Sequence, residues 1–511
     1  MAKLYEYQAK ELLGKQGLPV PMAEVADSSE AAKKIAEKFG RPLVIKAQAW
    51  VTGRAQAGGV RFADDSGQAR EVAGEILGMD LKGFKVTQVL MEERLDIERE
   101  FFLGLIIDDV AQAPVIVFSS VGGTGIEEIA REHPDKIAKC TVDIESGLTP
   151  HQARNLLVNL DIRGKLQNQI TGFLVKFYKF CRKVEARSAE INPVVLTKQG
   201  EVLAADCHLV IDDYAVFRHP ELGIEIAREF DRPPTALEKV SYQVEAGDHR
   251  GTFYFFQMER NPAPGEQYVG FHGAGGGGSM MSMDALFGQG FKLANFCDTS
   301  GNPSASKVYR AAKIILSQKN LMAYFASGSG VASQEQFHSA RGLVKAFREF
   351  GLAVPAVIRI GGNSEELAME ILQEFTQDLP GEVEAYGRDT SAAACAKRLR
   401  ELVDTWDYGK TPGQAFPRET AKKGGYSFET MTGAVFIDHE RCRSCEAKPC
   451  LESCIHDVLK LQDGKPVLAL SAEDARKGRC TECLACELAC EFYGNKAIHI
   501  DLPIPGLAEA I

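Results

Sequence analysis

Apolar runs alternate with amphipathic stretches through the middle of this 511-residue chain. Each run has the length of a strand and is followed by a loop and a helical pattern; the runs are 268–271, 293–297, 321–325, 354–360 and 383–386. A repeat of strand, loop and helix is typical of a doubly wound α/β domain built on a parallel sheet. We therefore predict such a domain over residues 266–402.

The rest of the chain divides around this domain. Residues 1–235 mix strand-like apolar runs with amphipathic helices, which predicts a separate α/β domain. We expect a connector over 236–265. Residues 403–434 lose the apolar periodicity and gain turn-forming residues, so we place a linker there and a third, small domain over 435–511. A chain of this length is expected to hold about three domains.

The segment 189–206 contains two strand-like runs joined by a turn, which predicts a hairpin. If the pairing is centred on Gln199, Asn192 faces Asp206 across the hairpin. Glu190 lies two residues along the strand and therefore on the same face. Three oxygen-bearing side chains thus converge. The alternative is a solvated hairpin face that carries polar residues without a ligand.

These side chains suit a metal and a nucleotide. Mg²⁺ prefers hard oxygen ligands together with phosphate oxygens, so Asn192 and Asp206 can hold it against a triphosphate. Lys46 ends a short apolar run and is followed by a glycine-rich loop. Lys46 can neutralise a phosphate, and Gly53 and Arg54 can close over it with a backbone amide and a guanidinium. The alternative for Lys46 is a solvated lysine at the end of a strand.

The predicted doubly wound domain has polar, glycine-rich loops after its strands. Ligands of such sheets bind at the carboxyl ends of the strands. The loops expected there are 272–279, 298–304, 327–333 and 361–364. Each can present the amides of a helix start to an anion. Close packing of the backbone explains the glycines equally well.

Composition and charge exclude several classes of protein. The chain is 45% hydrophobic and 25% charged, as expected for a globular protein. Its net charge of −11 would repel a phosphate backbone, so nucleic acid is a poor partner. The start lacks the apolar stretch of a signal peptide, and no window approaches the length of a membrane span. We expect a cytoplasmic protein with no membrane partner.

Eight of the 13 cysteines lie between 442 and 490. Their spacing is Cys442-x2-Cys445-x4-Cys450-x3-Cys454 followed by Cys480-x2-Cys483-x2-Cys486-x3-Cys490, which is one motif written twice. A cubane iron–sulfur cluster needs four thiolates around one small body, and a short loop wraps three sulfurs onto it. Paired zinc sites and disulfides are the alternatives, but zinc commonly takes two C-x2-C pairs and disulfides do not suit the cytoplasm. The other five cysteines, Cys140, Cys181, Cys207, Cys297 and Cys395, are expected to be buried thiols.

The double motif resembles bacterial-type two-cluster [4Fe-4S] ferredoxins. In that family the fourth cysteine of each run crosses to the other cluster. The resemblance therefore assigns Cys442, Cys445, Cys450 and Cys490 to one cluster, and Cys454, Cys480, Cys483 and Cys486 to the second. It implies a small α+β ferredoxin-like domain that carries electrons. Ile455 and Glu491 stand where the family usually has proline, and the first run has four residues before Cys450.

Three N-terminal motifs resemble the β subunit of succinyl-CoA synthetase. They are Glu6-Tyr7-Gln8-Ala9-Lys10, the loop from Lys46 to Gly59, and Glu190-Ile191-Asn192-Pro193 followed by Asp206. The similarity extends over roughly residues 1–400 and implies an ATP-grasp fold. It also implies roles for individual residues: Lys46, Gly53 and Arg54 on the phosphates, Glu92 and Glu100 along the nucleotide cleft, Asn192 and Asp206 on Mg²⁺, and Glu190 steering a phosphorylated histidine. Ala55 and Cys207-His208 depart from the family's Gly and Gly-Lys.

The same resemblance implies that the doubly wound domain is a flavodoxin-like CoA-ligase domain. It would bind the substrate carboxylate and meet an α subunit, which carries CoA and the phosphorylated histidine. The family's Asn-Gly-Ala-Gly is here His272-Gly273-Ala274-Gly275, and its Gly-Gly-Ile-Val-Arg-Cys stretch has become 327–333. His272, Gly273 and Gly275 are therefore candidate ligand contacts. His272 pairs with a substrate carboxylate or is a structural histidine.

Our leading hypothesis is the β-type subunit of an acyl-CoA synthetase that uses ATP or GTP, Mg²⁺ and CoA to activate a small carboxylic acid. The iron–sulfur domain would couple it to a ferredoxin-dependent oxidoreductase. The alternative is an electron-transfer or scaffold subunit whose ligase portion retains only nucleotide or CoA sensing. A third hypothesis, citrate-cleaving or citryl-CoA-forming chemistry, shares the ATP-grasp ancestry, but no cluster domain is expected there.

Overall fold

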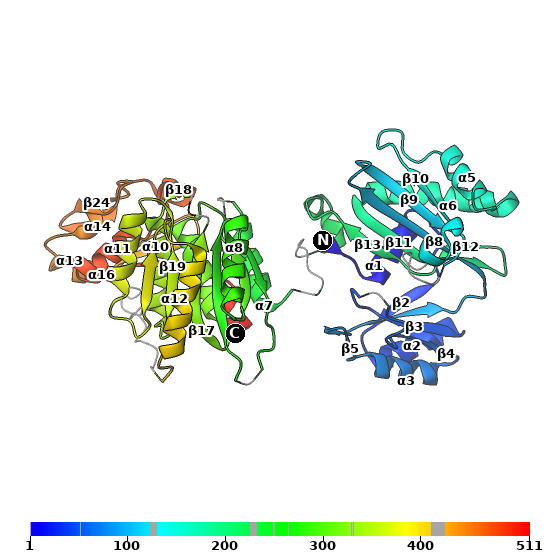
Figure 1. Ribbon diagram of the computed structural model, residues 1–511, viewed down its shortest axis with the longest axis horizontal. Coiled ribbons are helices and arrows are strands. Elements are labelled where there is room, and N and C mark those ends of the chain that lie inside the picture. Colours follow the sequence, from blue (N-terminus) through cyan, green and yellow to red (C-terminus); the bar gives the residue numbers. More distant parts are fainter. Residues whose placement is uncertain are drawn as a thin grey trace. The chain divides into compact units, whose positions relative to one another are not determined.

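The computed structural model divides into two compact units, Met1–Pro234 and Thr235–Ile511 (Figure 1). The residues that the structure describes are 2–51, 53–122, 130–224, 232, 234–248, 251–263, 265–328, 330, 332–409 and 425–511. Residues 410–424 of the predicted linker, and residues 329 and 331 of the predicted loop at 327–333, lie outside them.

The first unit contains a four-stranded antiparallel sheet with two helices against it. The strands, in spatial order, are β2 (Ala23–Ala26), β7 (Val89–Glu93), β3 (Leu43–Ala47) and β4 (Val60–Ala63). Helices α2 (Ser29–Phe39) and α3 (Ser66–Ile76) share its core. Each helix begins at a side-chain cap, because Ser28 and Asp65 accept a hydrogen bond from the backbone N–H three residues later. This sheet carries Lys46 near the end of β3.

A second, larger antiparallel sheet completes the first unit. Its spatial order is β1 (Ala2–Lys3), β13 (His208–Ile211), β11 (Ala186–Thr197), β8 (Ile97–Asp108), β9 (Ala113–Ser119) and β10 (Ile137–Thr141), and β12 (Val202–Ala204) also pairs with β11. Helices α1 (Glu6–Lys15), α5 (Pro150–Val158) and α6 (Gly164–Lys183) share its core. In α6 the buried positions Ile170, Phe173, Leu174 and Phe177 follow the helical repeat, which explains why this helix packs on one face.

The predicted hairpin between β11 and β12 is confirmed. Val194 lies opposite Ala204 and Leu196 opposite Val202, so the pairing is centred on residue 199. Glu190 lies opposite His208 of β13, which keeps the same centre. The register therefore places Asn192 opposite Asp206.

The second unit is built on a six-stranded sheet that contains all five predicted strands. Its order is β14 (Tyr254–Gln257), β16 (Asn295–Asp298), β15 (Tyr268–Ala274), β17 (Leu321–Gly328), β19 (Ala356–Arg359) and β21 (Val383–Tyr386). The five predicted strands are parallel, and β14 adds an antiparallel edge. The chain order reverses between β15 and β17, as in flavodoxin-like sheets. The expected connector 236–265 thus supplies a strand, and it also holds helix α7 (Ala236–Ala246).

Helices cover both faces of this sheet. Helices α8 (Gly276–Gly288) and α12 (Ala392–Thr405) share one core with it. Helices α9 (Ala305–Leu316), α10 (Phe337–Phe350) and α11 (Glu365–Thr376) share another. Two short paired strands, β18 (Ala332–Glu335) and β20 (Gly362–Asn363), lie beyond the sheet. The arrangement is the doubly wound one that the alternating pattern predicted.

The last residues of the chain form a small α+β part of the second unit. Strands β22 (Tyr426–Glu429), β23 (Ala434–Ile437) and β26 (Ile498–Asp501) form one antiparallel sheet, and β24 (Leu459–Gln462) pairs with β25 (Lys465–Leu468). Short helices α13 (His439–Arg443) and α14 (Pro449–Glu452) follow β23, and α16 (Ala485–Tyr493) precedes β26. Apolar residues of this part join those of α9, α10 and α11 in one core, so the cysteine-rich part is packed onto the doubly wound part.

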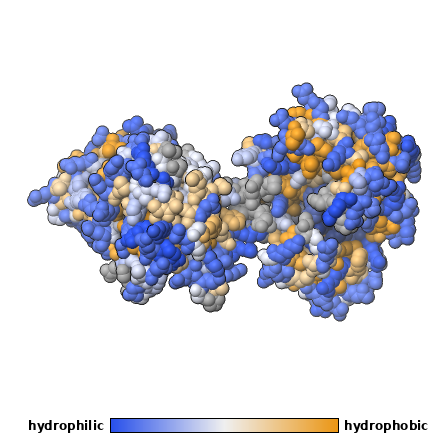
Figure 2. All heavy atoms as spheres, in the orientation of Figure 1, coloured by the Kyte–Doolittle hydropathy of each residue, from blue (hydrophilic) through white to orange (hydrophobic). Residues whose placement is uncertain are grey.

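Polar residues dominate the visible face of the second unit. In Figure 2 this face is largely hydrophilic, with hydrophobic residues between the polar ones. Some large apolar side chains are nevertheless exposed, among them Met280 and Met281 of α8. No helix in the part of the chain that the structure describes is both long and apolar enough to cross a bilayer.

Candidate functional site

A buried cluster of charged side chains surrounds Lys46 in the first unit. Lys46 Nζ lies 2.9 Å from Glu6 Oε1 and 2.5 Å from Glu92 Oε2. Lys10 Nζ lies 2.9 Å from Glu6 Oε1 and also pairs with Glu92. Both lysines donate to the backbone carbonyl of Ala205, at 2.7 Å from Lys46 and 2.6 Å from Lys10. The cluster therefore joins α1, β3, β7 and the segment after β12.

Arg54 connects the glycine-rich loop to the same cluster. Its Nη2 lies 2.7 Å from Glu6 Oε2 and 3.1 Å from Asp206 Oδ1, and its Nη1 donates to the carbonyl of Ala47 at 2.9 Å. Gly53, just before it, has a φ of +75°, a conformation that favours glycine. The loop is thus folded back so that Arg54 meets the predicted metal residue Asp206.

The charges in this cluster stabilise one another. Burial alone would lower the pKa of Lys46, but the carboxylates of Glu6, Glu92 and Asp206 hold it above its usual value. Burial alone would raise the pKa of Glu6, yet Lys10, Lys46 and Arg54 hold it well below its usual range. Both groups therefore stay charged at neutral pH, and Lys46 and Arg54 are cations whose charge the carboxylates balance.

The predicted metal residues lie on the neighbouring hairpin. Asn192 Nδ2 donates to Glu190 Oε1 at 3.2 Å, and the Asn192–Pro193 peptide bond is cis. Asp206 Oδ1 accepts from the backbone N–H of Cys207 at 2.7 Å. Glu100, predicted for the nucleotide cleft, is half-buried on β8 opposite Val195. Within the described residues, no group of three or more His, Cys, Asp or Glu side chains is placed so that it could hold a metal ion.

Sequence reasoning assigned no role to Glu6 and Lys10, although their motif was noticed. Both are buried on α1 beside Ala9 and Leu13. Charged residues four positions apart on the apolar face of a helix are rarely buried unless they are paired. That spacing was the signal that could have identified them as members of the site.

A second candidate site lies at the carboxyl ends of the parallel strands in the second unit. A small cavity of about 40 Å³ lies between the carboxyl ends of β15 and β17, where the strand order reverses. Its lining includes His272, Thr299, Ser327, Gln336, Ser339 and Arg359. Arg359 Nη1 donates to the carbonyl of Gly328 at 2.6 Å and its Nε to the carbonyl of Thr390 at 2.5 Å, which fixes the guanidinium at the cavity wall.

His272 is held inside this wall. Its Nδ1 lies 2.5 Å from the hydroxyl oxygen of Tyr324, and its Nε2 lies 3.4 Å from Thr299 Oγ1. Burial lowers the pKa of His272 to about 3. A neutral imidazole offers a hydrogen bond to a carboxylate but no positive charge. The histidine is therefore both a packed residue and a polar member of the cavity lining.

Two glycines of the loop after β15 are required by the local structure, each for a different reason. A Cβ on Gly273 would lie 2.1 Å from Ser279 Oγ and 2.5 Å from the carbonyl oxygen of Cys297, so only glycine fits there. Gly275 has a φ of +89°, and its N–H donates to Asp298 Oδ1 at 2.8 Å. The backbone N–H of Ser300 donates to the same oxygen at 2.8 Å. Asp298 therefore ties the loops after β15 and β16 together.

The eight clustered cysteines fall into two groups of four in their electrostatic environment. Burial raises the pKa of Cys442 to about 11 and that of Cys450 to about 12, and the nearest cysteines, which include Cys445 and Cys490, add to both. Burial also raises the pKa of Cys480 to about 11 and that of Cys486 well above its usual value; their cysteine neighbours are Cys454 and Cys483. The last cysteine of each run is therefore grouped with the first three cysteines of the other run.

The second group lines a cavity. Cys454, Cys480, Cys483 and Cys486 all border a small cavity of about 20 Å³ whose other walls include Val435, Val458, Leu484 and Ile500. Two sulfurs accept backbone hydrogen bonds, Cys454 Sγ from Val458 at 3.3 Å and Cys490 Sγ from Ala497 at 3.1 Å. All 13 cysteines are free thiols, and of the five outlying ones only Cys140 is half-buried rather than buried.

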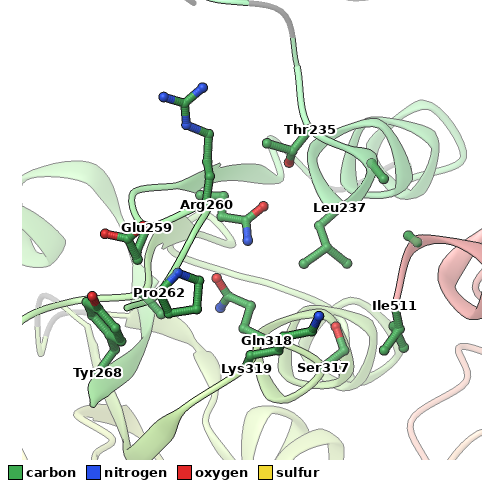
Figure 3. Close-up of a pocket in the computed structure, with 14 residues that line it drawn as sticks. Thr235, Leu237, Glu259, Arg260, Pro262, Tyr268, Ser317, Gln318, Lys319 and Ile511 are labelled. Carbon is green, nitrogen blue, oxygen red and sulfur yellow. The ribbon is translucent and has the colours of Figure 1, made fainter. Parts of the chain in front are cut away.

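Another pocket opens at the amino ends of the parallel strands in the second unit (Figure 3). It is lined by Leu237 of α7, by Glu259, Arg260 and Pro262, and by Gln318 and Lys319 at the end of α9. Gln318 Nε2 donates to Asn295 Oδ1 at 2.8 Å. This end of the sheet carries none of the loops in which the sequence predicted ligand contacts.

Two family models match the chain. An ATP-grasp domain model matches residues 3–196, and an "ATP citrate lyase citrate-binding" model matches residues 267–399. The succinate–CoA ligase [GDP-forming] subunit beta of Thermus thermophilus is 38% identical, over 72% of this chain and 93% of that protein. The succinate–CoA ligase [ADP-forming] subunit beta 2 of Archaeoglobus fulgidus is 36% identical, over 74% of this chain and 94% of that protein.

A solved structure has a similar fold. It is the ATP citrate lyase of Methanothrix soehngenii in complex with citrate and coenzyme A, with a TM-score of 0.65 and 19% sequence identity. The match covers 78% of this chain and 99% of that one. At this level of identity the likeness concerns the fold, and it extends over both the ATP-grasp and the doubly wound parts.

Proposed function

The chain belongs to the succinate–CoA ligase β-subunit family of acid–thiol ligases, and we propose that it is the nucleotide-binding subunit of a nucleoside-diphosphate-forming acyl-CoA synthetase. The reaction joins an acid and CoA while ATP or GTP is converted to the diphosphate and phosphate. A histidine on a partner α subunit carries the phosphoryl group between the two sites. The observation that carries the proposal is the buried cluster of Lys46, Arg54 and Asp206.

The charged cluster supports binding of the nucleotide phosphates. Lys46 and Arg54 now pair with Glu6, Glu92 and Asp206, and phosphate oxygens can take the place of these carboxylates. A guanidinium matches phosphate geometry with two parallel hydrogen bonds, and an ammonium acts as a compact charge. Both cations then stabilise the charge that spreads over the γ-phosphoryl oxygens during transfer. Lys10 stays available to neutralise Glu6 and Glu92.

The hairpin residues fit a Mg²⁺ ion. Asn192 and Asp206 face each other and offer an amide oxygen and a carboxylate, which are the hard ligands that Mg²⁺ accepts beside phosphate oxygens. When bound, the ion would neutralise phosphate charge and orient the γ-phosphoryl group. Asp206 becomes free to bind it when phosphates displace it from Arg54. Glu190, which accepts a hydrogen bond from Asn192, lies close enough to this metal residue to orient the incoming histidine.

The cavity between β15 and β17 is the proposed site for the acid and for the approach of the α subunit. The acid attacks the phosphohistidine, and the histidine leaves as the acyl phosphate forms; the CoA thiol then attacks the acyl carbon and phosphate leaves. Arg359 and the neutral His272, which both line this cavity, can hold a carboxylate there. The match to a citrate-binding model over this segment supports testing citrate beside succinate.

The experiment is a reconstitution of the chain with its α-type partner. Formation of nucleoside diphosphate is measured with ATP or GTP, CoA and either succinate, citrate or other small acids. We expect diphosphate formation that requires the acid, CoA and the partner together. Two results would contradict the proposal. One is diphosphate formation at the same rate without the acid and CoA, and the other is no diphosphate formation although the partner can be phosphorylated.

We also propose that the cysteine-rich part holds two [4Fe-4S] clusters and couples the ligase to a ferredoxin-dependent oxidoreductase. Support comes from the two groups of four thiols, from the cavity that borders all of Cys454, Cys480, Cys483 and Cys486, and from the backbone N–H groups that donate to sulfur. Each group supplies the four cysteines that such a cluster requires. The chemistry the clusters would supply is one-electron transfer.

The same cysteines favour a second candidate function, an electron-transfer subunit whose ligase part only senses nucleotide or CoA. Anaerobic purification from the native host, with identification of the proteins that co-purify, separates the two. An α-type chain with a phosphorylated histidine favours the synthetase. Redox subunits without an α-type chain favour the electron-transfer subunit.

A further inference from the structure

Helix α10 has two faces that serve different parts of the second unit. Ser339 and Leu343 line the cavity between β15 and β17. Arg341 lies two residues from each of them, which is about 200° around the helix axis. Its side chain therefore leaves the helix on the side away from that cavity, where it is half-buried.

The face that bears Arg341 also bears Lys345 and Arg348, at the spacing of one helix stripe. Lys345 Nζ lies 2.6 and 2.8 Å from the two carboxylate oxygens of Glu487, and the Arg348 guanidinium lies 4.8 Å from the ring centre of Phe492. Glu487 and Phe492 both belong to α16. The later residue of α10, Arg348, contacts the later residue of α16, Phe492. The two helices therefore lie side by side and run in the same direction.

This pairing fixes the neighbours of Arg341. Arg341 lies one turn before Lys345, which places it near the amino end of α16, where Cys486 lies in the first turn and Cys483 just precedes the helix. Burial lowers the pKa of Arg341, and the thiolates of Cys483 and Cys486 oppose that effect, as expected for groups that lie near one another. Arg341 therefore stands beside the cavity that the second group of cysteines borders.

Arg341 differs from the other cations of its stripe because its charge is not matched by a carboxylate. Lys345 pairs with Glu487 and Arg348 with Asp378. Among the residues that the structure describes, no carboxylate forms an ion pair with Arg341, whose guanidinium lies 4.7 Å from the ring centre of Phe337. The backbone of α10 next to it is packed closely on α9, since a Cβ on neighbouring Gly342 would lie 2.5 Å from the carbonyl oxygen of Ala305.

We propose that Arg341, a residue of the ligase part, raises the reduction potential of the cluster held by Cys454, Cys480, Cys483 and Cys486. The inference rests on the proposed clusters. One electron from a low-potential donor protein converts the oxidised [4Fe-4S] cluster to its reduced form and leaves the donor oxidised by one electron. The reduction adds a negative charge in a poorly solvated place, and a nearby unmatched guanidinium stabilises it.

The test is a reductive titration of the whole chain followed by electron paramagnetic resonance. The Cys445→Ser variant assigns the signals, because it is expected to lose only the other cluster. The signal that remains in this variant belongs to the cluster beside Arg341. In R341Q we expect its reduction equilibrium constant to fall about tenfold, which is a shift of about 59 mV for one electron. The potential of the other cluster stays the same.

Two variants control for structural damage. R341K keeps the charge and is expected to retain most of the potential, and R348Q makes the same chemical change on the same stripe where Asp378 already matches the charge. Equal potentials in R341Q and the unmodified chain would overturn the inference. If R341Q fails to hold the cluster, R341M, which also removes the charge, is titrated in its place with the same expected fall in potential. A chain without any cluster signal would instead overturn the proposed clusters themselves.

Discussion

Arg54 and Asp206 are joined by a two-fold contact, with Arg54 Nη2 3.1 Å from Asp206 Oδ1 and 3.2 Å from Oδ2. The contact bridges the glycine-rich loop and the end of the β11–β12 hairpin. A carboxylate that neutralises a guanidinium cannot at the same time coordinate a cation through the same lone pairs. Nucleotide phosphates that take over Arg54 would therefore release Asp206 for Mg²⁺, so the two halves of the site are filled together.

Asp206→Ala is expected to abolish most of the ligase activity while the clusters remain. Loss of the carboxylate removes a proposed metal ligand and leaves Arg54 with Glu6 alone, so we expect the rate of diphosphate formation to fall by about 100-fold or more. The measurement is acid- and CoA-dependent diphosphate formation with the partner present. Glu201→Ala, an exposed position on the same hairpin, is the control and is expected to keep full activity. An Asp206→Ala chain with normal activity would remove Asp206 from the metal site.

His272 is expected to stay neutral throughout the physiological pH range. Burial lowers its pKa to about 3, whereas an unfolded histidine takes up a proton near pH 6.5. Protonation therefore favours the unfolded chain, and stability falls by about 1.4 kcal/mol for each pH unit below about 6.5. NMR of a chain with labelled histidines, assigned with His272→Asn, is expected to show one imidazole that does not titrate between about pH 8 and pH 5.5. A midpoint near the ordinary histidine value would contradict this prediction.

Gly273→Ala is expected to damage the loop after β15. The added Cβ would lie 2.1 Å from Ser279 Oγ and 2.5 Å from the Cys297 carbonyl oxygen, and forced overpacking of this kind costs about 1–3 kcal/mol of folding stability. The measurement is thermal unfolding together with activity. Gly277→Ala is a matched control four residues on, because a Cβ there meets no atom within 4 Å. It is expected to leave stability unchanged or to raise it, since alanine favours a helix over glycine. Equal effects of the two substitutions would mean that the loop can relax.

Much of the fold follows from local patterns. The hairpin around Gln199 was predictable because its strands and turn are adjacent in sequence, so the register depends on nearby residues alone. The five parallel strands were predictable because each apolar run is short and is followed by a helical pattern. Strand β14 was missed because its sequence, Tyr254–Gln257, lies in a segment of turn-forming residues and pairs with β16 some 40 residues on.

The candidate site was less predictable because its contacts are long-range. Glu92 lies 82 residues from Lys10, and Asp206 lies 152 residues from Arg54, yet each pair is in contact. Spacing along the chain carries no information about such pairs; the family motifs supplied Lys46, Arg54 and Asp206. The buried pair of Lys345 and Glu487, 142 residues apart, had no sequence signal at all, since a charged residue on a helix is usually solvated.

The proposed assignment of the last cysteine in each run to the other run's cluster gives a final prediction. An assignment of each run to its own cluster would predict otherwise. Cys454 belongs to the first run in sequence, but it borders the same cavity as Cys480, Cys483 and Cys486. Cys454→Ser is therefore expected to remove the resonance signal that Cys483→Ser removes, and to lower the iron content from about eight to about four atoms per chain. Cys395→Ser, at a buried thiol outside both groups, is the control and should keep all the iron. If Cys454→Ser instead removes the signal that Cys445→Ser removes, each run holds its own cluster. Arg341 would then still lie beside the thiolates of the second run, because it neighbours Cys483 and Cys486 and not Cys454.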